Sequence, residues 1–108
     1  RTIISSFNHY SLVEIRKINP EIRTAPLYSA GLYEPWDYAR RMGACAVHPS
    51  FYSALPEIVK GCISNNIMIN PYTVDNPENI KALASAGVSG IITNVPDVAL
   101  KILSGMEA

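Results

Sequence analysis

Short apolar runs alternate with helical patterns along this chain at a nearly constant spacing. Five runs recur, at residues 2–6, 24–29, 44–48, 67–74 and 89–93, and they start 20 to 23 residues apart. Strands that alternate with helices at a steady period form right-handed βαβ units, whose strands pair in parallel. The runs are almost continuously apolar, as expected of parallel strands covered on both faces. The sequence therefore predicts five parallel β/α units.

Residues that begin and end helices occupy the intervals between these runs. Ser11, followed three residues later by a glutamate, has the spacing of a capping box at the start of the first predicted helix. Pro35 and Pro56 suit the first turns of the second and third helices. The interval 76–87 begins with Asn-Pro-Glu and ends with glycine, which predicts the fourth helix. A fifth helix follows Asn94 or Val95.

Two architectures accept five such units. One is part of a TIM (β/α)8 barrel, and the other is an open, doubly wound five-strand sheet. Periodicity does not choose between them, but strand order would, since a reversal of the order marks the open sheet. No linker, low-complexity tract or charge block divides the sequence, so we expect residues 1–108 to form a single domain.

Composition excludes several classes of partner. The 9 basic and 9 acidic residues are well mixed, so no basic stripe for nucleic acid and no polybasic segment is present. The apolar runs are far too short for a membrane span. Cys45 and Cys62 lie in apolar or helical patterns and are predicted to be buried free thiols, which favours a reducing, cytoplasmic location.

Polar side chains gather where the predicted strands end, which is where both architectures place their functional sites. Hydroxyl and amide groups predominate there, and Asp75 is the only carboxylate close to a strand end. A hard divalent cation usually takes several oxygen ligands with more than one carboxylate. Ser5 and Ser6 lack an activating base in the sequence and are predicted to be polar lining. No catalytic residue and no metal ligand is therefore predicted in this chain.

Three residues near the carboxyl ends of the predicted strands, which we call the rim, each have two possible roles. His9 either stands in the first turn of a helix as a capping or solvated residue, or hydrogen-bonds a phosphate. His48 either shapes its loop through a rim hydrogen bond or contacts a substrate. Tyr72 is either a core aromatic or the floor of a pocket, and the alternation of strand side chains places it on the same face as Asn70. Nothing places the two histidines beside a shared nucleophile.

Several segments resemble the glycerophosphodiester phosphodiesterase family. Ile-Ile-Ser-Ser-Phe-Asn-His at 3–9 is similar to a family strand whose Ser-Phe lines the pocket, and 27–28 and 44–49 resemble the next two strands. Tyr-Thr-Val-Asp-Asn-Pro-Glu at 72–78 is similar to the family's Trp-Thr-Val-Asn-Asp-Pro-Glu. Residues 87–97 are similar to Gly-Val-Asp-Gly-Ile-Ile-Thr-Asp-x-Pro-Asp. The resemblance implies the carboxyl-terminal five units of the family's barrel.

The chain departs from those patterns at several positions. Tyr72 stands in place of tryptophan, Asp75 in place of asparagine, and Ser89 and Asn94 in place of aspartates. The family's His-Arg-Gly motif, its second histidine, its metal-binding carboxylates and a phosphate-neutralising lysine belong to its earlier units and have no counterpart here.

The resemblance implies a metal-dependent hydrolase that converts glycerophosphodiesters to glycerol 3-phosphate and an alcohol. In the complete family enzyme a divalent cation, Mg²⁺ or Ca²⁺, supports catalysis, and none is expected to be bound by this chain alone. We expect this chain to supply part of the substrate pocket, through Ser6, Phe7, His48, Tyr72 and Asn94. The ligand would be a glycerophosphodiester or glycerol phosphate.

Two further expectations concern assembly. An incomplete barrel leaves strand edges unpaired, so we expect self-association or pairing with an amino-terminal fragment. The alternative function is a non-catalytic module for phosphate-ligand binding or assembly.

Overall fold

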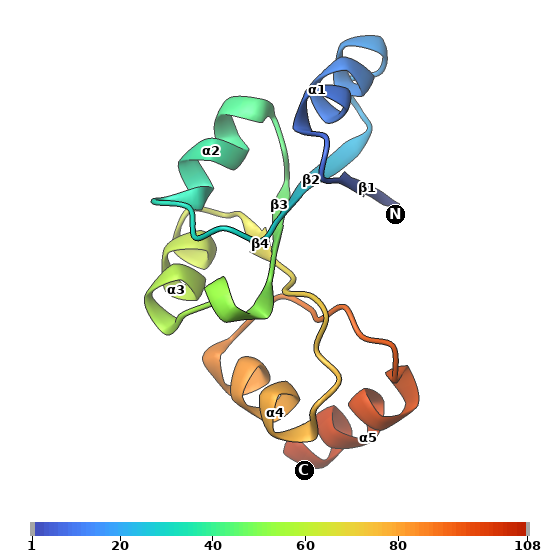
Figure 1. Ribbon diagram of the computed structural model, residues 1–108, viewed down its shortest axis with the longest axis vertical. Helices are drawn as coiled ribbons and strands as arrows, with labels where there is room; N and C mark the ends of the chain where they lie inside the picture. The colour runs from blue at the N-terminus through green and yellow to red at the C-terminus, as the bar shows by residue number, and fades with distance from the viewer. Residues whose placement is uncertain (1, 108) are drawn as a thin grey trace.

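The computed structural model describes residues 2–107, in which short parallel strands alternate with helices (Figure 1). The prediction of a single domain covers residues 1–108, and residues 1 and 108 lie outside the described part. The strands are β1 (Ile3–Ser6), β2 (Arg23–Tyr28), β3 (Ala46–Pro49) and β4 (Met68–Ile69). The helices are α1 (His9–Ile18), α2 (Pro35–Met42), α3 (Pro56–Ser64), α4 (Pro77–Ala86) and α5 (Pro96–Glu107), with a 3-10 turn, η1 (Phe51–Ser53), before α3.

The strands are neighbours in the order in which they occur in the chain, β1-β2-β3-β4, and every pair is parallel. The helices α1, α2 and α3 each connect one strand to the next, α4 and α5 follow β4, and Figure 1 shows α1 to α5 following one another along the molecule. Sequential order is the winding of a (β/α)8 barrel, whereas an open doubly wound sheet reverses its order at a switch point. The partial-barrel prediction is confirmed, and the four strands show no such reversal.

The fifth predicted strand, at 89–93, lies beside the fourth run without forming a regular ladder. The Ser89 N–H donates to the carbonyl of Ile69 (3.0 Å) and the Ile92 N–H to that of Pro71 (2.9 Å). One segment thus advances three residues while the other advances two, which is a bulge. Pro71 has no N–H to donate, so the ladder is interrupted at that residue. The prediction of five regular strands was wrong in this respect, and β4 is limited to two residues.

The start of α1 also differs from the prediction. The helix begins at His9, and the side-chain oxygen of Asn8 accepts a hydrogen bond from the Ser11 N–H (3.1 Å). Asn8 is an effective cap because its side chain satisfies an amide that has no partner within the helix. Ser11 is therefore an interior residue of the first turn and not the cap.

The main core lies between the strands and the helices that cover them. Val47, Ile69 and Val74 contribute fully buried side chains from the strand side. Val59, Cys62, Ile80, Leu83 and Ala99 pack from the helices. Burying a large aliphatic side chain contributes about 1.5–3 kcal/mol, so this layer holds the strand ends in fixed positions relative to one another.

Two further expectations can be compared with the structure. Cys45 and Cys62 are both free, with Cys62 buried and Cys45 only partly so. Among residues 2–107, none of the helices combines the length and hydropathy needed to cross a bilayer.

Candidate functional site

Phe7 and Tyr72 meet where β1 ends and where the chain continues beyond β4. Their ring centroids are 6.0 Å apart and the ring planes are nearly perpendicular, at 88°. The Phe7 side chain is 64% exposed, so most of its ring faces solvent. The structure therefore brings together two of the five residues predicted to contact substrate. We call Phe7 and Tyr72 the ring pair.

Tyr72 is held firmly from several directions. Its hydroxyl donates to the carbonyl of Tyr28 at the end of β2 (3.0 Å). Its backbone N–H donates to the Pro49 carbonyl (3.0 Å), and its own carbonyl accepts from the Phe51 N–H (2.7 Å). The hydroxyl is thus committed to the scaffold, and the ring is the part of the side chain that remains for a ligand.

His48 lies near the end of β3 and is 7% exposed. Its Nε2 is 3.1 Å from the side-chain nitrogen of Asn70, which can only donate, so Nε2 accepts. In neutral imidazole the proton is then on Nδ1, and Nδ1 has no hydrogen-bond partner among the described residues. Burial lowers the pKa of His48, which favours this neutral form.

A third cluster joins the end of the fourth run to the end of the fifth. Asp75 Oδ1 accepts from the Asn94 backbone N–H (2.8 Å) and from the Thr93 hydroxyl (2.9 Å). Asp75 Oδ2 accepts from the Asn94 side-chain amide (3.2 Å). The Asn94 N–H, followed by the Thr93 hydroxyl, lowers the pKa of Asp75 because these donors stabilise its charged form. The predicted site residue Asn94 is thus engaged with a carboxylate.

Ser6, the fifth predicted site residue, is used locally. Its hydroxyl oxygen accepts from the Asn8 N–H (3.0 Å), in the turn that connects β1 to α1. This bond helps to position Phe7, which lies between the two residues.

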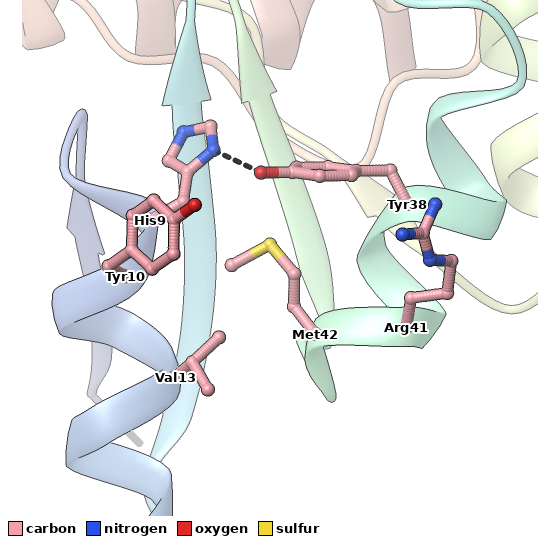
Figure 2. A pocket seen from close by; sticks show the side chains of 6 residues that line it. All are labelled: His9, Tyr10, Val13, Tyr38, Arg41 and Met42. Carbon is pink, nitrogen blue, oxygen red and sulfur yellow. Dashed lines mark hydrogen bonds between the residues drawn. The ribbon is translucent and has the colours of Figure 1, made fainter.

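His9 connects three elements on the helical side of the sheet. Its Nε2 is 2.7 Å from the carbonyl of Leu27, which can only accept, and its Nδ1 is 2.6 Å from the Tyr38 hydroxyl. Figure 2 shows this imidazole directed toward Tyr38. The two side chains also line a cavity of about 290 Å³ between α1 and α2. Both ring nitrogens are bonded within the protein, so His9 is not the capping residue, and neither nitrogen remains for a phosphate.

The described residues contain no group of three or more His, Cys, Asp or Glu side chains that could hold a metal ion. Asp75, the one carboxylate at a strand end, already accepts three hydrogen bonds through its two oxygens. A hard divalent cation prefers several carboxylate and carbonyl oxygens that are free to coordinate it. The donor set at these strand ends does not fit such an ion.

Comparison with known proteins identifies the family. The sequence profile of the glycerophosphoryl diester phosphodiesterase family matches residues 1–98. The chain belongs to this family. A glycerophosphodiester phosphodiesterase from Caldanaerobacter subterraneus subsp. tengcongensis is 44% identical over 103 residues, which are 95% of this chain and 42% of that protein.

Solved structures show the same fold. A protein from Silicibacter pomeroyi DSS-3 that is assigned to the glycerophosphoryl diester phosphodiesterases superposes with a TM-score of 0.92 at 27% identity. That match covers 99% of this chain and 39% of the other. A phosphodiesterase from Oleispira antarctica, solved in complex with the product sn-glycerol-3-phosphate, has a TM-score of 0.82 at 19% identity over 98% of this chain and 42% of its own.

This chain therefore corresponds to part of a glycerophosphodiester phosphodiesterase barrel. It spans between 37% and 44% of the length of the curated relatives that it matches. Four parallel strands in sequential order agree with such a portion.

The partners of the site residues were largely missed at the level of sequence. The alternation of side chains predicts Asn70 on the same face as Tyr72, but its bond to His48 was not predicted. The bond from Tyr72 to Tyr28 joins residues 44 positions apart and left no local signal.

Proposed function

We propose that this chain forms the substrate-facing wall of a glycerophosphodiester phosphodiesterase, as the carboxyl-terminal portion of its barrel. The observation that carries the proposal is the ring pair at the carboxyl ends of the strands, within a chain that belongs to this family. In (β/α)8 enzymes the active site lies at this end of the barrel. The product found in the Oleispira antarctica phosphodiesterase supports glycerol 3-phosphate as the kind of product released.

Each residue of this wall has a role that follows from its contacts. The ring pair offers an apolar surface, with Tyr72 fixed by Tyr28. His48, neutral and buried, holds Asn70 through Nε2 and so supports the wall from behind. Asn94, held by Asp75, keeps the fifth run beside the fourth. These groups bind and orient a substrate, and the cation and the acid–base groups of the reaction belong to another part of the enzyme.

The test is hydrolysis of glycerophosphocholine by three preparations at equal concentration. The first is the parent polypeptide, by which we mean the complete barrel enzyme that would contain this chain under the proposal. The other two are this 108-residue chain alone and this chain mixed with the remainder of the parent. We expect activity in the parent, none in the chain alone, and partial recovery in the mixture. Hydrolysis at enzymatic rates by the chain alone would overturn the proposal.

A second experiment separates this proposal from a non-catalytic binding module. In the parent polypeptide, His48→Ala removes the imidazole that bonds Asn70, and Tyr72→Ala removes one ring of the pair. We expect both substitutions to lower kcat/KM by about tenfold or more, since a lost hydrogen bond or an apolar wall contributes about 1–2 kcal/mol. A parent that binds glycerol phosphate but hydrolyses no phosphodiester would favour the binding module.

A further inference from the structure

The helical layer carries a recess that the proposed function does not use. A cavity of about 290 Å³ lies between α1 and α2, and six side chains of these two helices line it (Figure 2). They are His9, Tyr10, Val13, Tyr38, Arg41 and Met42. Every one of them belongs to the described part of the chain, and none is among the five residues predicted to contact substrate.

One wall of this cavity, formed by His9 and Tyr38, is held by hydrogen bonds. The His9 Nε2 donates to the Leu27 carbonyl of β2 (2.7 Å), and Nδ1 of the neutral ring then accepts from the Tyr38 hydroxyl (2.6 Å). The centroids of the two rings are 5.5 Å apart and their planes are tilted by 52°. Because these polar atoms are already bonded within the protein, this wall presents mainly ring surface to a ligand.

The walls beside it are apolar or aromatic. Figure 2 shows Met42 reaching from α2 into the space between the helices, with Val13 facing it from α1. Tyr10, also on α1, is 87% exposed, so its ring stands at the opening. A thioether makes favourable contacts with aromatic rings. The volume lies near the lower end of the range of about 300–1,000 Å³ that is typical of ligand pockets, so these walls suit one small, flat ring.

One lining residue carries a permanent charge. The guanidinium of Arg41 is charged at every physiological pH. The described residues form two ion pairs, and Arg41 belongs to neither, whereas its neighbour Arg40 is paired with Asp37. A guanidinium binds a carboxylate through two parallel N–H bonds, and one cation balances one carboxylate rather than a doubly charged phosphate. The charge of the cavity therefore matches an acid with a single negative charge.

We propose that the cavity between α1 and α2 binds a small aromatic carboxylate, with its ring between Tyr10 and Met42 and its carboxylate on Arg41. The bonded rings of His9 and Tyr38 form the back of this site. The site lies outside the substrate wall, so the proposal does not depend on the proposed function.

Methionine methyl groups test where the ligand binds. The parent polypeptide is labelled with ¹³C at its methionine methyls, the Met42 signal is assigned with Met42→Leu, and benzoate is titrated by NMR. An aromatic ring beside Met42 should shift its methyl signal through the ring current, and the shift should saturate. The methyls of Met68 and Met106 should not move, since neither lines this cavity. A Met42 signal that stays in place at every benzoate concentration would overturn the proposal.

An uncharged isostere tests the role of the charge. Benzamide has the ring and nearly the shape of benzoate but lacks its charge. We expect benzoate to bind about five-fold tighter, as for an ion pair at an exposed site. Arg41→Gln should remove this difference, and Arg40→Gln is the matched control, because Arg40 is paired with Asp37 and does not line the cavity. Equal affinities of the parent for the two ligands would contradict the proposal.

Competition separates this site from the substrate wall. An excess of glycerol 3-phosphate should leave the benzoate-induced shift of Met42 unchanged, because the ring pair and the cavity share no residue. Displacement of benzoate by glycerol 3-phosphate would overturn the cavity proposal, since one site would then bind both. A parent that hydrolyses glycerophosphocholine without any shift of Met42 by benzoate would also overturn only the cavity proposal. A parent that binds benzoate beside Met42 but hydrolyses no phosphodiester would overturn only the proposed function.

Discussion

At the scale of single residues, Asp75 and Asn94 form a contact between a carboxylate and an amide. The positions of the acid and the amide are reversed relative to the family pattern. The family pattern that the chain resembles has asparagine at the first position and aspartate at the second, and this chain has the reverse. The structure shows why both arrangements are compatible, since the Asn94 amide donates to the Asp75 carboxylate (3.2 Å). Reversing the pair again would keep one amide donor facing one carboxylate.

This complementarity predicts a non-additive pair of substitutions. The single variant Asp75→Asn should lower Tm because two amide groups then face each other. The single variant Asn94→Asp should lower Tm by a larger amount because two carboxylates then repel each other. The double variant Asp75→Asn/Asn94→Asp should recover most of the lost Tm. A thermal melt of the four proteins measures this coupling, and a double variant with additive losses would show that the contact does not depend on complementarity.

The same carboxylate predicts a pH dependence. The Asn94 N–H and then the Thr93 hydroxyl hold the pKa of Asp75 below its usual value of about 3.9. The charged form is therefore favoured in the folded state. Its contribution to stability is fully present above the usual pKa and is lost as the pH falls through the lowered value. A ¹³C titration of the Asp75 carboxyl carbon should show this low midpoint, and Thr93→Val should raise it part of the way.

At this scale the sequence predicts where a side chain lies along a run, while its role in binding stays a prediction. His48 lies in β3 and Tyr72 in the segment that continues beyond β4, as the apolar runs predict. Asp75, Thr93 and Asn94 are different, because their contact depends on how two separate runs align. A bulge between those runs sets the alignment, and no local sequence signal gave its position.

At the scale of elements, the packing of α2 against α3 depends on one glycine. A Cβ atom at Gly61 would lie 2.2 Å from Cζ3 of Trp36, far inside contact distance. Gly61→Ala should therefore destabilise the fold by about 1–3 kcal/mol through overpacking, in spite of the better helix propensity of alanine. Chemical denaturation measures the loss. Trp36 is the only tryptophan in the sequence, so its fluorescence reports the displaced ring directly.

Gly105 in α5 provides the matched control. A Cβ there would meet nothing within 4 Å, so Gly105→Ala changes helix propensity without changing packing. We expect stabilisation of about 0.5–1 kcal/mol. A similar gain in both variants would refute the role assigned to the contact between Gly61 and Trp36.

The elements themselves were predicted with different success for physical reasons. Proline at the start of a helix and glycine after its end act locally, and α2 and α4 begin and end where these residues predict. The fifth run was predicted as a strand because Ser89 to Thr93 is apolar and follows the period. Regular pairing also needs a donor at each step of the neighbouring run, and Pro71 lacks one.

At the scale of the whole molecule, the sheet of residues 2–107 has two outer edges. β1 pairs only with β2 within the described part, and the run at 89–93 bonds only the segment that follows β4. Unpaired strand edges are templates for further pairing, and natural proteins rarely leave them bare. The side chains of Ile4 and Ile92 are each 37% exposed, so apolar surface accompanies both edges. In the intact barrel, the remaining units would occupy these edges.

This geometry predicts that the isolated 108-residue chain associates through its edges. Light scattering over increasing concentration should give a mass that rises above the 11.8 kDa of one chain. Ile4→Lys should reduce the association, because a charged side chain on an edge strand opposes pairing. Ile18→Lys is the control, since Ile18 is 86% exposed but lies at the end of α1, away from β1. A mass that stays at one chain at every concentration would contradict the prediction, and equal effects of the two lysines would assign the association to another surface.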